Sequence, residues 1–266
     1  MVRPAAGALH GRDTWSWELN SRWFPLIGGP RAAILQVCDP KVAAGVASFS
    51  TYRTDPLGRL ERTLDAMLAI GFGSPERREA TLEGLARGHA SVRGTTADGE
   101  EYRADDPELQ YWVLATLVDT VLEVERRYVG RLRERDRAAY FDESKLLARA
   151  FGIPDRLVPR DLTSFRGYVA DRFATLEPSA ESIDITRRLM RPGLRFPPDQ
   201  TFVPLNWATT ELLPTRLRHR LGLADLNAAE LAALRAARTG SRGTPPHLHR
   251  ALSVNPLSVR AVRAAA

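Results

Sequence analysis

The sequence predicts an all-α fold built as one large domain, and three observations support this prediction. First, four segments begin with a capping residue followed by proline: Asp39-Pro40, Asp55-Pro56, Ser74-Pro75 and Asp106-Pro107. Asp and Ser side chains accept hydrogen bonds from the free N–H groups of a first helical turn, where proline has no N–H to lose. Second, apolar residues recur at helical spacing behind these starts. Third, no long alternating pattern indicates a sheet.

These signals divide the chain into expected elements. Helices are expected near residues 30–38, 40–49, 56–72, 75–91, 106–129, 134–151, 161–175, 179–191, 202–220 and 227–239. One strand-like segment runs from Val92 to Arg103, where Asp98-Gly99 can close a short hairpin. We expect a helical domain over residues 1–240, and a basic C-terminal tail over 241–266 that is either packed on it or mobile.

Length and composition exclude several classes of protein. The chain has 266 residues, of which 44% are apolar and 26% charged, so it can bury a sizeable core. A single cysteine, Cys38, excludes an intramolecular disulfide and a cysteine-based zinc cluster. Residues 1–13 lack the apolar region of a secretory signal, and no apolar run approaches 18 residues. A cytoplasmic protein without a membrane span is therefore expected.

The basic character of the chain comes almost entirely from arginine. Only Lys41 and Lys145 are lysines among 38 basic residues, and the formal net charge is +6. From residue 215 to 266, nine arginines face only Asp225 and Glu230. That region could contact nucleic acid, but it has neither interleaved aromatic residues nor a recognition motif. A solvated surface is the favoured interpretation.

Two arginines and a threonine continue an apolar stripe in the segment 56–72. Arg59, Arg62 and Thr63 lie at helical spacing from Ala66, Met67 and Ile70. Guanidinium groups on a partly buried face need anionic partners, because an unpaired buried charge is very costly. Those partners are either internal acids, such as Asp65 or Asp119, or a bound anion such as a cofactor carboxylate.

His89 is the histidine best placed for chemistry. It extends the apolar stripe of Leu82, Leu85 and Val92, so it is expected at a core position. It is either a hydrogen-bonded core residue or a ligand. The other histidines lie in terminal segments or among arginines: His10, His219, His247 and His249. This distribution does not favour a metal held by several histidines. A macrocycle that supplies four nitrogens needs only one protein ligand, which His89 could provide.

Several short motifs occur in a specific order between about residues 23 and 168. They are Gly28–Ala32, Leu35–Gln36, Val42–Val46, Asp55–Thr63, Phe72–Gly73, His89–Gly94, Asp98–Pro107, Trp112–Thr116 and Gly152–Pro154. In this order and spacing the chain resembles the MpaB and latex-clearing-protein (rubber oxygenase) family of haem b oxygenases. The resemblance implies an all-helical domain with a haem pocket between core helices.

The resemblance also implies roles for individual residues. His89 matches the proximal iron ligand of latex-clearing proteins. Arg59, Arg62 and Thr63 match a set on the distal side of the haem, where they would polarise bound oxygen or anchor propionates. Family members often carry histidine where this chain has Asp39, Phe49 and Leu114, and no glutamate lies upstream of Arg59 at the place of the family's catalytic base. These departures indicate that the distal chemistry has changed.

Three rival features have ordinary structural explanations. Cys38 could be a thiolate haem ligand, but it lacks a Gly-rich surround and fits a buried free cysteine better. Gly28-Gly29-Pro30-Arg31 could bind phosphate, but it lacks the Lys-Ser/Thr of a P-loop and fits the start of a helix. Asp119 lies in a strongly apolar segment and is either a base or, as favoured, the acid that orders an arginine.

The sequence and the resemblance together predict a haem b-dependent oxygenase. It would use O₂ to oxidise a small apolar molecule, which could be an isoprenoid or another alkene, and an electron donor could serve as a further partner. The alternative is a helical binding protein without catalysis, whose basic C-terminal region contacts nucleic acid or a protein partner.

Overall fold

The computed structural model describes residues 13–22, 24–194 and 197–243, and these form an all-α fold with one small hairpin. The α-helices are α1 (Trp15–Asn20), α2 (Phe24–Ile27), α3 (Gly29–Val37), α4 (Pro40–Phe49), α5 (Pro56–Phe72), α6 (Pro75–Ser91), α7 (Pro107–Val124), α8 (Glu134–Ala150), α9 (Leu162–Thr175), α10 (Ala180–Met190), α11 (Val203–Leu212), α12 (Thr215–Arg220) and α13 (Ala228–Gly243). A π-helical turn, Glu125–Val129, follows α7, and two 3₁₀ turns, Asp155–Leu157 and Asp199–Phe202, precede α9 and α11. The expected fold class is confirmed.

The predicted helix starts are confirmed by their caps. Asp39 accepts a hydrogen bond from Lys41 N at 2.9 Å, and Asp55 accepts one from Gly58 N at 2.9 Å. Ser74 and Asp106 cap α6 and α7 in the same way. The helices α4, α5 and α6 therefore have the predicted bounds.

Other boundaries differ from the predictions for local reasons. The helix expected over 202–220 is broken at Leu213 and Pro214, because proline has no N–H to donate and forces the preceding residue into an extended conformation. The helices α1 and α2, with six and four residues, are too short to show a period. Helix α13 extends to Gly243, past the boundary expected at residue 240. Residues 244–266 of the expected tail lie outside the described residues.

The expected hairpin is also confirmed. Strand β1 (Arg93–Thr95) pairs antiparallel with β2 (Glu101–Arg103), and Gly94 lies opposite Tyr102. Gly99 adopts φ +86°, which glycine reaches at no steric cost, and this explains why an Asp-Gly pair stands at the turn.

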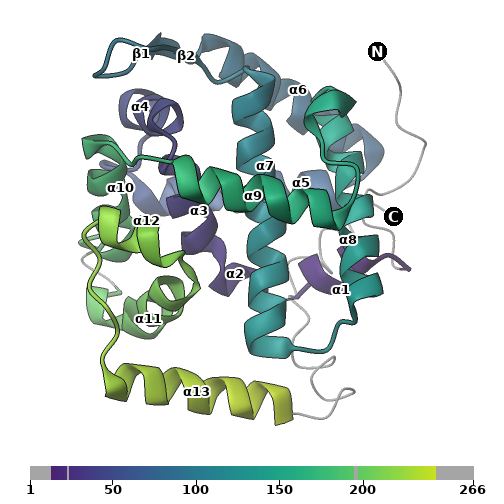
Figure 1. Cartoon of the computed structure of the whole chain (residues 1–266). Helices are drawn as coiled ribbons and strands as arrows, with labels where there is room; N and C mark the ends of the chain where they lie inside the picture. Colours follow the sequence, from purple (N-terminus) through teal and green to yellow (C-terminus); the bar gives the residue numbers. More distant parts are fainter. Residues whose placement is uncertain (1–12, 23, 195–196, 244–266) are drawn as a thin grey trace.

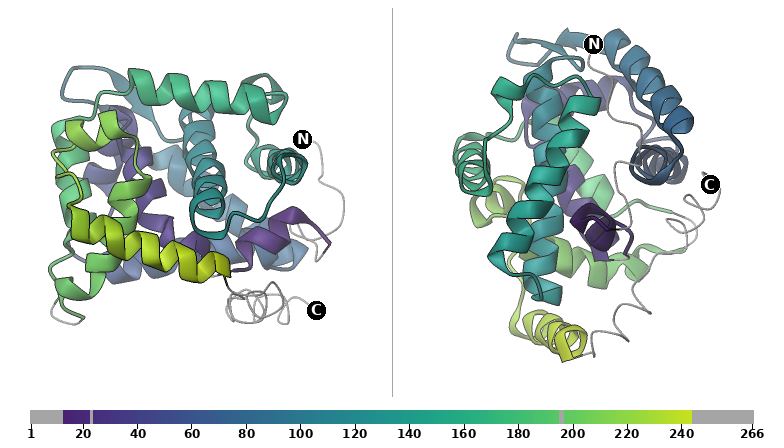
Figure 2. Two further views of the ribbon diagram at one scale, coloured as in Figure 1. Left: turned by 60° about the horizontal axis from the view of Figure 1, so that its bottom comes forward. Right: turned by 90° about the vertical axis from the view of Figure 1, so that its right-hand side faces the viewer.

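Helix α7 runs through the middle of the molecule, and the other helices surround it (Figure 1). Figure 2 (right) shows α9 on one side of α7, with α5 and α6 on the opposite side. Helix α7 consequently buries residues around most of its circumference, including Trp112, Ala115 and Val118. A helix that is apolar on nearly all sides is typical of such a central position.

Helix α3 is joined to α7 and α11 by Arg31, whose residue exposure is 2%. Its guanidinium donates to Asp119 Oδ2 at 2.7 Å, to Thr120 Oγ1 at 2.6 Å and to the Leu212 carbonyl at 2.9 Å. All three nitrogens are thereby used, which makes burial of the charge acceptable. The prediction that Asp119 orders an arginine is confirmed.

Gly28 allows the start of α3 to approach α7 closely. A Cβ atom at this position would lie 2.4 Å from Thr120 Cγ2 and 3.0 Å from Val124 Cγ2, whereas a Cβ at Gly29 would meet nothing within 4 Å. Both neighbours are β-branched side chains that rotate little within a helix. Residues 28–31 thus form the N-terminal end of α3, as the interpretation of the Gly-Gly-Pro-Arg motif as a helix start predicted.

We predict that Gly28→Ala destabilises the protein by about 1–3 kcal/mol, the usual cost of forcing an extra carbon into a packed core. The matched control is Gly29→Ala, which has free space and should be neutral or slightly stabilising. Thermal unfolding followed by circular dichroism checks both variants, and equal melting temperatures would contradict the close approach.

Candidate functional site

The arginines and the threonine that the sequence singled out lie in the first turns of α5, beside the segment that connects it to α4. Arg59 Nε donates to Ser50 Oγ at 3.2 Å, and its Nη1 donates to Thr63 Oγ1. The Thr63 hydroxyl in turn donates to the Arg59 carbonyl at 2.8 Å. The structure therefore brings Arg59 and Thr63 together on one face of α5.

Arg62 is held by the same connecting segment. Its Nη1 lies 3.1 Å from Asp55 Oδ2, and its Nη2 donates to Thr51 Oγ1 at 2.7 Å. The prediction that Asp65 or Asp119 pairs with the α5 arginines is wrong, because Asp65 pairs with Arg77 and Asp119 pairs with Arg31. The sequence identifies Asp55 only as a helix cap, because a capping signal does not reveal what the second carboxylate oxygen contacts.

The stripe on α5 is less buried than predicted at its N-terminal end. Arg59 and Arg62 are both classed as exposed, whereas Ile70 and Phe72 at the other end are buried. Surrounding atoms nevertheless crowd the Arg59 guanidinium and, with the nearby charge of Arg62, lower the pKa of Arg59. Two neighbouring cations of this kind favour the approach of an anion.

Helices α5 and α6 pack mainly against each other, and they lie behind α7 in Figure 1. Three of the large apolar side chains exposed in the described part of the chain belong to this neighbourhood: Phe49 at the end of α4 is 52% exposed, Leu60 is 54% exposed and Met67 is 46% exposed. Leu60 and Met67 are seven residues apart on α5 and so share a face. Large apolar groups left in solvent beside charged ones are typical of a surface that receives a ligand.

His89 lies near the end of α6, and the structure makes it half-buried rather than a core residue. The prediction that its stripe is buried is wrong, because Leu82, Leu85 and Val92 are also only half-buried. Within the described residues neither ring nitrogen forms a hydrogen bond, so His89 is not a hydrogen-bonded core histidine. Burial lowers the pKa of His89, and Asp105 opposes this effect. The imidazole is therefore neutral near pH 7, which is the form that binds metals.

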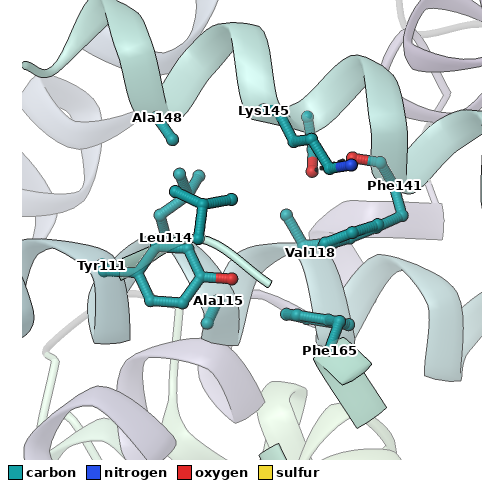
Figure 3. A pocket seen from close by; sticks show the side chains of 10 residues that line it. Tyr111, Leu114, Ala115, Val118, Phe141, Lys145, Ala148 and Phe165 are labelled. Atoms are coloured by element: carbon teal, nitrogen blue, oxygen red, sulfur yellow. Dashed lines mark hydrogen bonds between the residues drawn. The ribbon is translucent and has the colours of Figure 1, made fainter. Parts of the chain in front are cut away.

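The three positions at which family members often carry histidine lie apart from one another. Asp39 is buried, caps α4 and pairs with Arg172 at 2.6 Å, so its role is structural. Leu114 lines a cavity of about 10 Å³ between α7, α8 and α9 (Figure 3). Phe49 is exposed at the end of α4 and directly precedes Ser50, whose hydroxyl accepts a hydrogen bond from Arg59.

Cys38 is fully buried, and this burial, with a smaller effect of Asp39, raises the pKa of its thiol to about 12. The side chain is consequently a protonated thiol at neutral pH and not a thiolate ligand. This agrees with its interpretation as a buried free cysteine.

We predict that Cys38 reacts with iodoacetamide at least about a hundredfold more slowly in the folded protein than in guanidinium chloride, because the thiolate is the reactive species and its formation is suppressed. Mass spectrometry of alkylated protein measures this rate. Fast alkylation under native conditions would show that the thiol is exposed or ionised.

Four of the six arginines that the structure describes in the basic C-terminal region pair with internal acids, whereas Arg242 donates to the Arg126 carbonyl and Arg235 is exposed. Arg216 and Arg220 pair with Glu177, Arg218 with Asp225, and Arg238 with Glu211. The remaining arginines of this region beyond residue 243 lie outside the described residues. The described part therefore supports the solvated, internally paired surface over a nucleic-acid site.

Together the fold and the motifs define an all-helical oxygenase domain. The chain belongs to the family described as ER-bound oxygenase mpaB/B′/Rubber oxygenase, catalytic domain, which it matches over residues 16–243. The family is one of oxygenases. The resemblance identified from the motifs is confirmed.

Two curated proteins are similar to part of the chain. Both are 29% identical to it over 141 residues: "Uncharacterized protein Rv2237" of Mycobacterium tuberculosis and "Uncharacterized protein Mb2261" of Mycobacterium bovis. The match covers 51% of this chain, and it spans 54% of the length of each relative. No solved structure matches the chain significantly.

Two further properties hold for the described residues 13–22, 24–194 and 197–243. No group of three or more His, Cys, Asp or Glu side chains in those ranges could hold a metal ion. Likewise, no helix in the described part of the chain is both long and apolar enough to cross a membrane.

Proposed function

We propose that this protein is a haem b-dependent oxygenase that uses O₂ to oxidise a small apolar molecule, with the cofactor bound beside α5 and α6. One observation carries the proposal: an unpaired neutral imidazole on α6 neighbours a helix that exposes large apolar side chains and two arginines. Haem needs the same three things, namely one axial nitrogen ligand, apolar contacts for the macrocycle and cations for its carboxylates.

The residues fit this cofactor in chemistry. His89 would hold the iron, since its imidazole is neutral and has no hydrogen-bond partner among the described residues. Leu60 and Met67 would contact the macrocycle and be removed from water, which is favourable for exposed apolar groups. A bound haem would supply the redox chemistry that activates O₂.

The remaining residues would stabilise negative charge, form hydrogen bonds or exclude water. Arg59 and Arg62 would pair with cofactor carboxylates or stabilise negative charge that develops during the reaction. Thr63 carries no charge, so its hydroxyl can only donate or accept a hydrogen bond. Phe49 and the apolar face of α5 would exclude water and favour an apolar substrate.

The non-catalytic binding protein remains the competing proposal, because no glutamate lies upstream of Arg59 at the place of the family's base. Asp55 is the carboxylate that the structure places beside Arg62, but it already caps α5. A colourless protein that hemin cannot reconstitute would favour this alternative.

We predict that the protein binds about one hemin per chain with a Soret band, and that His89→Ala abolishes or greatly weakens this binding. The matched control is His219→Ala, because His219 is exposed and contacts only Asp225 within the described residues. Titration with hemin followed by visible absorption measures both. Unchanged binding by His89→Ala would contradict the axial assignment.

The lowered pKa of His89 predicts how hemin binding depends on pH. Burial favours the neutral ring, so protons compete with iron only below the ordinary value of 6.5. Hemin affinity should therefore be nearly constant from about pH 8 to 6.5 and then fall, approaching tenfold per pH unit once His89 is mostly protonated. A decline that begins above pH 7 would show that another group controls binding.

Arginine and threonine variants separate charge from hydrogen bonding. Arg59→Gln and Arg62→Gln should each weaken hemin binding by about three- to tenfold, since these partly solvated cations interact modestly. Thr63→Ala should bind hemin normally, and Arg77→Gln on α6 is the control for loss of a surface arginine. Equal effects of Arg62→Gln and Arg77→Gln on hemin affinity would contradict the proposal that α5 forms part of the binding site.

A further inference from the structure

A second cavity, separate from α5 and α6, lies where α3, α7, α9, α11, α12 and α13 meet. Its volume is about 510 Å³, within the range of small-molecule sites. In Figure 1, α11 and α12 lie to the left of the lower half of α7, and α13 lies below it. Arginines and acids line one part of the cavity, and apolar side chains line another part.

The acids that line this cavity are already engaged. Asp119 pairs with Arg31, and Glu123 accepts hydrogen bonds from Arg126 and Arg127. Glu211 accepts one from Tyr128 at 3.1 Å and pairs with Arg238 at 2.8 Å. Little acceptor capacity is left for a cationic ligand.

The arginines that line the cavity keep unused donors. Arg127 uses only Nε, toward Glu123, so its two terminal nitrogens have no partner among the described residues. Arg218 uses Nη2 toward Asp225, and its Nη1 has no hydrogen-bond partner within the described residues. Guanidinium nitrogens that keep free donors favour an anionic ligand that supplies acceptors.

The apolar lining lies beside these donors. Phe173 from α9 and Leu231 from α13 are both half-buried, and Pro214 lies between α11 and α12. These groups offer contacts to a hydrocarbon body but no hydrogen bonds. The combination of spare guanidinium donors and apolar side chains matches an amphipathic anion.

We propose that this cavity binds a small organic acid, whose carboxylate accepts hydrogen bonds from Arg218 and Arg127 and whose apolar body contacts Phe173 and Leu231. The carboxylate would accept from the free terminal nitrogens of these two guanidinium groups. This site is independent of the proposed haem site, because it shares no residue with α5 or α6.

Isothermal titration of octanoate into the full-length chain, in a buffer without carboxylate or phosphate, tests the proposal. Saturable binding at one site is expected. Arg218→Gln and Arg127→Gln should each weaken it by about ten- to hundredfold, as for loss of a charge-assisted hydrogen bond. Arg235→Gln is the matched control, because Arg235 is exposed on α13 and does not line the cavity.

Two further probes test the two halves of the ligand. Acetate keeps the carboxylate but lacks the chain, and octylamine keeps the chain but reverses the charge, so both should bind at least tenfold more weakly than octanoate. Octanoate binding that is absent, or that survives both Arg127→Gln and Arg218→Gln, would overturn the proposal. Should Arg218→Gln fail to fold by circular dichroism, Arg127→Gln decides. Hemin titration of the same variants separates this outcome from failure of the haem proposal, since hemin binding should be unchanged.

Discussion

The arrangement of helices depends on the guanidinium of Arg31. This buried cation joins α3 to Asp119 and Thr120 of α7 and to the last carbonyl of α11. Removing one partner from a buried ion pair typically costs about 3–5 kcal/mol, a large part of the stability of a domain. Gly28 provides the close approach that lets Arg31 reach these partners. Residues 28–31 therefore fix the position of α3 against α7 and α11.

The same construction leaves α5 and α6 comparatively free. Helix α7 is fixed by α3 on one part of its surface and by α8 and α9 on another, whereas α5 and α6 pack chiefly against each other. The C-terminal end of α5 is anchored, as the contact of Phe72 with Trp17 at 5.3 Å between ring centroids shows. Its N-terminal end carries the exposed arginines and apolar residues.

The pairing of charged residues also differs between the helices packed around α7 and the helix pair α5 and α6. Arginines near α11, α12 and α13 are largely matched by internal acids, which explains how an arginine-rich chain forms a compact body. Arg59 and Arg62 differ, because they neighbour each other and only Arg62 has an acid partner, Asp55. Arg59 therefore has no acid partner among the described residues, whereas Arg127 and Arg218 are paired with acids but keep unused hydrogen-bond donors.

The sequence by itself determined most of the longer helices, the caps of α4 to α7 and the family. Asp-Pro and Ser-Pro pairs are local signals, so α4, α5 and α6 could be predicted residue by residue, and the motif order identified an oxygenase family. Periodicity also placed Arg59, Arg62 and Thr63 on one helix. Only the tertiary structure decided that Asp55 rather than Asp65 pairs with Arg62, and that the stripe containing His89 is half-buried. Burial and pairing depend on which helices pack together, and helical spacing specifies a face without specifying what covers it.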